Sequence, residues 1–211
     1  MSEKKLLIAT GNKHKAQEIE EILRKALPDF ELKTVLASYF QEVREPEENG
    51  VTFLENALIK AHHYARSTGL LALADDSGLV IDALEGRPGV HSARYADTPQ
   101  TRIDLVLKEL EGIEPAQRTA RFVCVAALAD PGGNVTFCEG KIEGWISRTP
   151  RGEGGFGYDP IFVPASEITS PGEIDSARTL AQFTAQEKNS ISHRGRAMER
   201  IAESIPLQVF R

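Results

Sequence analysis

Two adjacent aspartates, Asp75 and Asp76, follow an apolar stretch and precede the small residues Ser77 and Gly78. On an extended chain successive side chains point to opposite faces, so neighbouring acids do not easily serve one site as a pair. We expect Asp76, next to Ser77 at a strand end, to be held rigidly as a metal ligand or general base requires. Asp75 is expected to face the other way, as a turn or supporting residue, and its replacement by Asn should harm activity less than that of Asp76. A tight turn whose aspartates bond their own backbone is the structural alternative.

An acidic segment upstream offers further carboxylates. Glu47 and Glu48 lie in an irregular stretch that ends at Gly50. One or two acids, with water and substrate phosphates completing the ligand set, form the pattern of a Mg²⁺ site rather than of a Zn²⁺ or Ca²⁺ cage. Asp76 and this acidic loop are therefore candidate ligands for Mg²⁺.

The segment from Thr10 to Lys15 connects a predicted strand to a predicted helix. Backbone N–H groups and the helix dipole at such a junction hold anions, and Lys13 and Lys15 add positive charge. The segment lacks the ending of a Walker A loop. A solvated helix cap with surface lysines is the alternative interpretation.

A glycine-rich segment from Gly152 to Pro160 contains an aromatic ring at Phe156 and an acid at Asp159. The glycines let the backbone approach a flat ligand, on which the ring stacks while the carboxylate accepts a hydrogen bond. A nucleobase fits this description, and a loop folded against the sheet is the alternative.

Three donors follow near a helix start, Lys188, His193 and Arg194. They are suited to carbonyl oxygens or phosphates, although basic turns on a surface have the same composition. Taken together, the anion-binding loop, the carboxylates, the aromatic segment and these donors describe a nucleoside triphosphate site.

The elements that must position these groups mix strands with helices. We predict strands at residues 5–9, 32–36, 70–74, 79–84, 119–129 and 135–141, the last two as a hairpin that residues 145–146 extend, and helices at 13–27, 52–67 and 98–110, with helical composition over 177–202. This order predicts an α/β (mixed α+β) fold with a long mixed sheet flanked by helices and a cleft near strand ends.

Composition limits the possible functions. The 211 residues, 41% hydrophobic and 27% charged, predict one folded domain over 1–211. A net charge of −6 argues against non-specific nucleic-acid binding. No apolar segment is long enough to span a membrane or to form a secretory signal, so we expect a cytoplasmic protein. Cys124 and Cys138 lack metal or redox spacing and are expected to be core residues.

Six segments, taken in order, resemble the inosine triphosphate pyrophosphatase family, also called Ham1-like or RdgB-like. They are Thr10-Gly-Asn-x-x-Lys15, Phe53-Leu-Glu-Asn-Ala57 with Lys60, Ala74-Asp-Asp-Ser-Gly78, Ser92-Ala-Arg-Tyr95, Gly154-Gly-Phe-Gly-Tyr-Asp-Pro160 and Glu187-Lys-Asn-Ser-Ile-Ser-His-Arg-Gly195. The resemblance extends from Leu6 to Ala197.

The resemblance implies a Mg²⁺-dependent homodimer with a long sheet between two lobes, which hydrolyses ITP, dITP and XTP to the monophosphate and pyrophosphate. It implies that Asp76 is the catalytic base, that Glu47 and Asp76 bind the metal, and that Arg194 lies at the purine base. A donor such as Arg194 facing the 6-oxo group would favour hypoxanthine or xanthine over adenine. The other residues implied to bind substrate are Thr10, Gly11, Asn12, Lys13, His14, Lys15, Lys60 and Ser77, together with Phe156, Gly157, Tyr158, Asp159, Lys188 and His193.

Two features depart from the pattern or stay open. The segment from Ser166 to Arg178 is longer and more irregular than the family's usual connection. The choice of Glu47 over Glu48 rests only on distance along the chain from Gly50. A Maf-like pyrophosphatase for other nucleotides and a non-catalytic nucleotide sensor are the competing functions.

Overall fold

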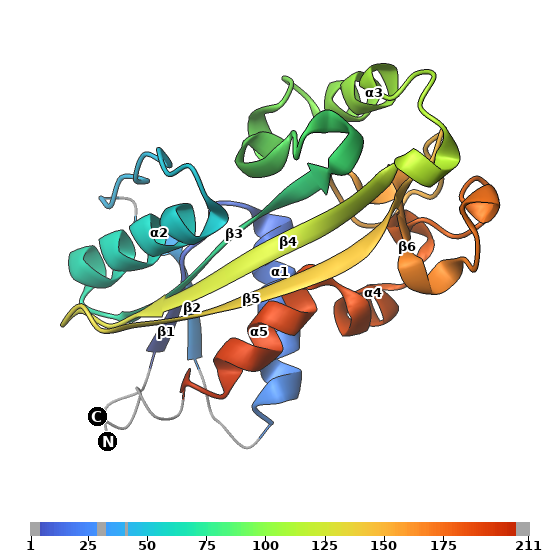
Figure 1. Ribbon diagram of the computed structural model, residues 1–211. Helices are drawn as coiled ribbons and strands as arrows, with labels where there is room; N and C mark the ends of the chain where they lie inside the picture. The colour runs from blue at the N-terminus through green and yellow to red at the C-terminus, as the bar shows by residue number, and fades with distance from the viewer. Residues whose placement is uncertain (1–4, 29–32, 41, 206–211) are drawn as a thin grey trace. The chain divides into compact units, whose positions relative to one another are not determined.

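The computed structural model describes residues 5–28, 33–40 and 42–205, and a six-stranded sheet organises this part of the chain (Figure 1). The strand order is β2-β1-β3-β4-β5-β6. The strands are β1 (Lys5–Ile8), β2 (Lys33–Leu36), β3 (Leu71–Ile81), β4 (Thr119–Ala129), β5 (Val135–Ile146) and β6 (Phe162–Pro164). Because β1 pairs in parallel with β2 and β3 whereas β5 and β6 are antiparallel, the predicted mixed sheet is confirmed.

Contacts divide the chain into two compact units. Unit 1 comprises residues 1–76, 124–140 and 193–211, and unit 2 comprises 77–123 and 141–192. Each of β3, β4 and β5 therefore contributes residues to both units.

In unit 1 the sheet carries helices on both faces. The helices α1 (Lys13–Ala26) and α5 (His193–Ala202) pack together over one face, and α2 (Phe53–Thr68) covers the other (Figure 1). Side chains alternate between these faces along each strand: Leu73 belongs to the core under α1 and α5, and Ala72 and Ala74 belong to the core under α2. This alternation decides where the two aspartates of β3 point.

Two helices of unit 1, α1 and α2, begin at side chains that accept hydrogen bonds from the free N–H groups of the first turn. Asn12 Oδ1 accepts hydrogen bonds from the backbone of His14 and Lys15 at the start of α1. Thr52 and Glu55 form a reciprocal capping box at the start of α2, as their spacing predicts. Both caps lie next to predicted site segments.

Unit 2 has its own core between its part of the sheet and its helices. Its helices are α3 (Pro99–Glu109) and α4 (Ala185–Ile191). Leu79 and Ile81 of β3 pack with Ile103 and Val106 of α3 and with Phe162 of β6. The segment 166–178 contains short 3₁₀ turns and is held partly by Arg178, which pairs with Glu167 and Glu187.

Most predicted elements are confirmed, with two corrections. Residues 71–81 form one continuous strand, so the predicted break around Ser77 and Gly78 is wrong. The region 177–202 becomes α-helical only at Ala185 and is divided at Ser192. β4 and β5 are neighbours joined by a turn at 130–134, as predicted, and both cysteines are free. In the described ranges, no helix combines the length and apolar character needed to cross a membrane.

Candidate active site

The two aspartates of β3 lie on opposite faces of the strand. Asp75 pairs with Lys15 of α1, at 3.1 Å, whereas Asp76 pairs with Lys60 of α2, at 3.4 Å. The predicted opposite orientation is confirmed, and the expectation of a turn at Asp75 is wrong because the strand continues through it. Each acid consequently has its own set of partners.

Asp76 is buried and is held at both carboxylate oxygens. Lys60 Nζ approaches Oδ1, and Asn56 Nδ2 donates to Oδ2 at 3.2 Å. Burial raises the pKa of Asp76, Lys60 opposes this rise, and Glu48 adds to it. For Lys60, burial alone would lower the pKa, but the surrounding carboxylates outweigh it and the pKa is raised. The result is a buried, hydrogen-bonded carboxylate with a basic character.

The acidic loop (residues 42–50) approaches this site through Glu48. Lys60 Nζ contacts Glu48 Oε2 at 3.1 Å, so one ammonium group is shared between Glu48 and Asp76. Glu47 is exposed. Glu45 lies beside Gly11, and a Cβ atom added at Gly11 would collide with Oε1 of Glu45. The contacts within the described chain favour Glu48 as the second acid, and a metal role for Glu47 stays a prediction.

The segment from Thr10 to Lys15 forms the predicted junction between β1 and α1. Thr10 Oγ1 accepts from Asn12 N at 3.2 Å, and the first turn of α1 contains no acidic residue. Lys13 and His14 are exposed there. The junction thus joins a helix N-terminus with basic side chains, which is the arrangement that an anion requires.

Asp75 lies at the centre of a buried charge network. Its Oδ2 contacts Lys15 Nζ and, at 3.2 Å, Arg194 Nη2, while Arg194 Nη1 contacts Glu18 at 2.5 Å. Burial alone would raise the pKa of Asp75, but Lys15 and Arg194 hold that pKa far below its usual range. For Arg194, burial alone would lower the pKa, but the neighbouring carboxylates of Asp75 and Glu18 outweigh burial and raise that pKa. This network connects the β1–α1 junction to α5.

In unit 2, Phe156, Asp159 and Lys188 form a second cluster. Lys188 Nζ contacts Asp159 Oδ2 at 2.6 Å and lies 4.6 Å from the centre of the Phe156 ring. Phe156 N also donates to Asp159 Oδ2, at 2.8 Å. Gly155 has φ 68° and leaves no room for a Cβ atom beside that carboxylate, so glycine is required here. These contacts bring Lys188 together with Phe156 and Asp159, whereas the sequence grouped it with His193 and Arg194, which belong to unit 1. A role of the cluster in binding the base stays a prediction.

The remaining predicted residues are distributed between the units. Tyr158 lies in the core of unit 2 and donates to the carbonyl oxygen of Ser92 at 3.0 Å. Ser77 and Gly157 also belong to unit 2, whereas His193 is buried at the start of α5 in unit 1. Contact of these residues with substrate stays a prediction.

Two residues of unit 1 that contact the candidate site were not assigned from the sequence. Asn56 contacts Asp76, and Glu18 contacts Arg194. Asn56 precedes Lys60 by four positions on α2, and Glu18 follows Lys15 by three on α1, so each pair shares a helix face. That spacing was the available signal.

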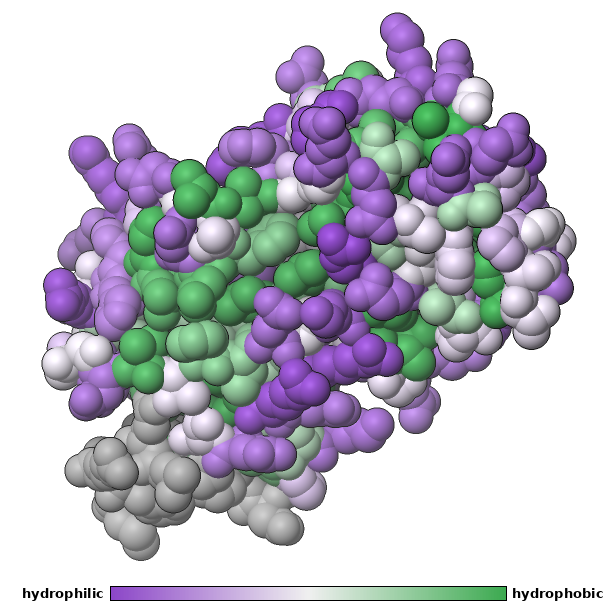
Figure 2. Space-filling view, in the orientation of Figure 1, coloured by the Kyte–Doolittle hydropathy of each residue, from purple (hydrophilic) through white to green (hydrophobic). Residues whose placement is uncertain are grey.

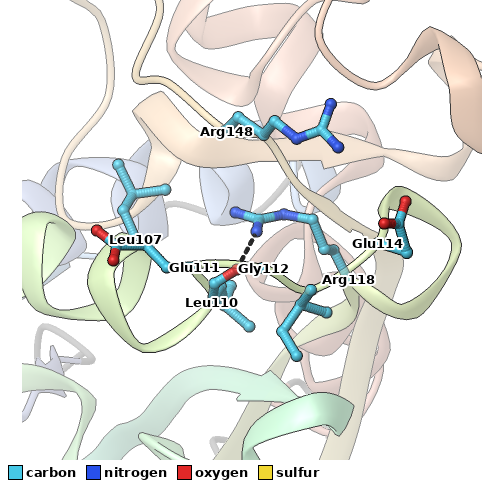
Figure 3. Close-up of a pocket in the computed structure, with 8 residues that line it drawn as sticks. Leu107, Leu110, Glu111, Gly112, Glu114, Arg118 and Arg148 are labelled. Carbon is cyan, nitrogen blue, oxygen red and sulfur yellow. Dashed lines mark hydrogen bonds between the residues drawn. The ribbon is translucent and has the colours of Figure 1, made fainter.

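A pocket of about 270 Å³ in unit 2 has a different character (Figure 3). Arg118 and Arg148 line it, as Glu111 and Glu114 do, so the charges of these four side chains balance. Arg118 donates to the carbonyl oxygens of Leu110, Ile146 and Ser147, at 2.7 to 3.0 Å. Arg118 therefore holds the backbone at Leu110 and at residues 146–147 together. None of the predicted site residues lines this pocket.

Metal ligands of the cage type do not occur in the described ranges, where no group of three or more His, Cys, Asp or Glu side chains is placed to hold an ion. The carboxylates of Asp76 and Glu48 share Lys60 instead. Hard oxygen donors in such small number suit a divalent ion that also takes ligands from water and phosphate.

Comparison with known proteins gives a consistent result. The model of the Ham1 family matches residues 6–204. A dITP/XTP pyrophosphatase of Elusimicrobium minutum is 45% identical over 95% of this chain and 99% of its own length, and one of Bacillus subtilis is 45% identical over 95% and 96%. The structure of a HAM1 protein from Coxiella burnetii matches with a TM-score of 0.82 and 43% identity, over 96% of this chain and 98% of that one. On these grounds the chain belongs to the Ham1 family.

Proposed function

We propose that this protein hydrolyses dITP, ITP and XTP to the nucleoside monophosphate and pyrophosphate, and so removes deaminated purines from the nucleotide pool. The observation that carries the proposal is the buried carboxylate of Asp76, held by Lys60 and Asn56 beside an acidic loop. Support also comes from relatives named dITP/XTP pyrophosphatases, which align over nearly the whole chain.

In the reaction, a water oxygen bonds to the α-phosphorus, and the bond from that phosphorus to the bridging oxygen breaks. The electron pair of the broken bond leaves on pyrophosphate, and Asp76 accepts the proton from the water. The raised pKa of Asp76, caused first by burial, makes its carboxylate a stronger base than an exposed aspartate. Lys60 and the β1–α1 junction supply positive charge and N–H donors for the phosphates.

The acids of the site fit a divalent ion, for which we propose Mg²⁺. Asp76 and Glu48 would hold it, because their hard oxygen atoms already lie around one shared cation, the ammonium group of Lys60. When bound, Mg²⁺ neutralises charge on the triphosphate and favours ionisation of a bound water. Glu47 remains the alternative second acid.

For the base, we propose recognition by Phe156, Asp159 and Lys188. The contacts among these residues hold a ring, a carboxylate and an ammonium group in one cluster. We also propose that Arg194 favours a 6-oxo purine, although its contacts with Asp75 and Glu18 already engage three of its nitrogens. A site built around such donors discriminates strongly against an amino group.

We further propose that residues 1–211 act as one domain, as a homodimer and in the cytoplasm. The family match across both units supports a single functional domain. Apolar side chains gather on the visible surface in the region of α2 (Figure 2), and Tyr39 and Val51 of unit 1 are 76% and 81% exposed, which supports self-association. Sedimentation of the purified protein tests the dimer.

The proposal is tested by pyrophosphate release from a panel of ITP, dITP, XTP, ATP, GTP, UTP, CTP and methylated nucleotides with Mg²⁺. We expect turnover of the deaminated purines to exceed that of the four ordinary nucleotides by a wide margin. Equal turnover of all nucleotides would refute the proposal, and a preference for pyrimidine or methylated nucleotides would favour the Maf-like alternative.

The sensor alternative is tested with Asp76→Asn. Because the amide keeps the shape of the carboxylate but cannot accept the proton from water, we expect ITP to bind while hydrolysis falls steeply. Tight binding of ITP by the wild-type protein without turnover under any divalent ion would favour a sensor.

A further inference from the structure

Asn56 is wholly buried on α2, and both ends of its amide are used. Its Oδ1 accepts from Gly50 N at 2.8 Å, and its Nδ2 donates to Asp76 Oδ2 at 3.2 Å. The partners fix the orientation of the amide, because the backbone N–H of Gly50 only donates and an ionised carboxylate only accepts. If the amide were flipped, its oxygen would face the carboxylate of Asp76 and its NH₂ group would face the N–H of Gly50, so both contacts would be repulsive.

The contacts of Asn56 join the acidic loop to β3. Gly50 ends the acidic loop, and two residues before it Glu48 contacts Lys60, which in turn contacts Asp76. Four contacts among Asn56, Asp76, Lys60, Glu48 and Gly50, together with the backbone from Glu48 to Gly50, therefore form a closed ring, hereafter the Asn56 ring. In this ring the separation of the two acids is set by one amide and one ammonium group.

Local structure around Gly50 holds the ring in place. The capping box of α2 folds residues 51–52 against Glu55, whose Oε2 accepts from Val51 N at 2.7 Å and from Thr52 N at 3.2 Å. A Cβ atom added at Gly50 would lie 2.7 Å from Asn56 Oδ1 and 2.7 Å from Glu55 Cβ. Only glycine allows the loop backbone to approach the amide this closely.

We propose that Asn56 is a positioning residue that sets the geometry of the metal-binding acids, by orienting Asp76 and by tying the acidic loop to it. This role rests on the proposed function in so far as those acids serve hydrolysis. Asn56 donates to Oδ2 of Asp76. The other carboxylate oxygen of Asp76, Oδ1, faces Lys60, which also contacts the acidic loop. Removing outer partners of metal ligands typically weakens metal affinity or activity roughly 10- to 100-fold.

The test compares Asn56→Ala and Gly50→Ala with Asn49→Ala, an exposed neighbour in the acidic loop that serves as the control. Mn²⁺ affinity is measured in the absence of nucleotide, and hydrogen exchange of the Gly50 amide is measured in the metal-free protein. For Asn56→Ala we expect Mn²⁺ binding weakened by roughly 10- to 100-fold and faster exchange at Gly50. Gly50→Ala should weaken Mn²⁺ binding in the same direction, and Asn49→Ala should behave as wild type.

Kinetics separate this role from a merely structural one. We expect both variants to need more Mg²⁺ for half-maximal pyrophosphate release, with the KM for nucleotide nearly unchanged at saturating Mg²⁺. If Asn56→Ala does not fold, Gly50→Ala decides. A folded variant that binds Mn²⁺ as tightly as the wild-type protein would overturn the proposal. A loss of Mn²⁺ binding that is fully accounted for by the fraction of unfolded protein would also overturn it. If the wild-type protein hydrolyses none of the nucleotides yet Mn²⁺ binding still depends on Asn56, the proposed function fails and the positioning role stands.

Discussion

At the scale of single residues, Asp75 and Asp76 show how neighbours acquire different tasks. The carboxylate of Asp75 is fully buried and is balanced by Lys15 and Arg194, with no exposed face toward solvent. Asp76 keeps a small exposed fraction and a raised pKa, of which burial is the first cause. We therefore assign Asp75 to stabilising the fold, and Asp76 is the acid that we propose for the chemistry.

We expect Asp75→Asn to destabilise the protein by about 3–5 kcal/mol, because it leaves the buried charge of Arg194 with one carboxylate partner fewer. Asp76→Asn should change the free energy of unfolding much less. Urea unfolding followed by circular dichroism measures both. Activity, compared per folded molecule, should still fall further in Asp76→Asn, and similar losses in the two variants would contradict the division of tasks.

The lowered pKa of Asp75 predicts a specific acid dependence. Its stabilising contribution is fully present above the pKa of an unfolded aspartate, about 3.9, and is lost as the pH falls toward the lower pKa of the folded state. Below about pH 4 the free energy of unfolding should thus fall more steeply in the wild-type protein than in Asp75→Asn. Parallel pH profiles of the two proteins would show that Asp75 is not the titrating group.

At this scale the sequence predicted the orientation of the two aspartates better than it predicted which side chains contact them. The opposite orientation of the two acids followed from strand geometry alone. Distance along the chain did not distinguish Glu47 from Glu48, since in an irregular loop only tertiary contacts, here with Lys60, determine which side chain faces inward. Asn56 was missed although it shares a helix face with Lys60, because its contacts with the backbone of Gly50 and the carboxylate of Asp76 are tertiary contacts that the spacing alone does not specify.

At the scale of elements, the seating of α5 on β5 in unit 1 depends on a glycine. A Cβ atom at Gly140 would collide with the carbonyl oxygen of His193 and would lie 2.5 Å from Ala197 N. Arg200 Nη1 donates to the carbonyl oxygen of Glu139 at 2.7 Å, on the same pair of elements. Helix α5 carries Arg194, so this contact also places the partner of Asp75.

We expect Gly140→Ala to destabilise the protein by about 1–3 kcal/mol, since the added methyl group meets backbone that cannot rotate away. Thermal unfolding measures the change. Gly172→Ala is the matched control, because the nearest heavy atom to its Cβ would lie 3.9 Å away. Equal melting temperatures for the two variants would contradict the close packing of α5 on β5.

Elements were predicted where local signals and tertiary packing agree. The capping box of α2 and the apolar periodicity of α1 gave correct helices. The small residues Ser77 and Gly78 suggested a turn, yet pairing within the sheet keeps them in β3. Tertiary hydrogen bonding outweighed a local turn preference there.

At the scale of the whole molecule, the path of the chain links the two units covalently several times. Each of β3, β4 and β5 begins in one unit and ends in the other. If one unit unfolds, the parts of β3, β4 and β5 in that unit lose their strand partners. The same strands continue into the other unit, so its sheet is disturbed as well. This connectivity favours a single cooperative transition.

We expect the two units to unfold with the same urea midpoint. Trp145, the single tryptophan, reports on unit 2 through its fluorescence. In a Cys138→Ser background, thiol labelling of Cys124 reports on unit 1, because that thiol is buried in the native protein. Separate midpoints would show that the units unfold independently.

The placement of Asp75 and Asp76 on opposite faces of β3 separates their contacts but not their electric fields. Lys60, on α2, lowers the pKa of Asp75, and Lys15, on α1 at the other face of the strand, lowers that of Asp76. The strand thus keeps the side chains of the two faces out of contact, while Coulomb interactions still act across it. A neutral substitution of Lys15 would therefore alter the proton affinity of Asp76 without contacting it. The junction that we propose for the phosphates would in this way also tune the proposed base on the other face of the strand.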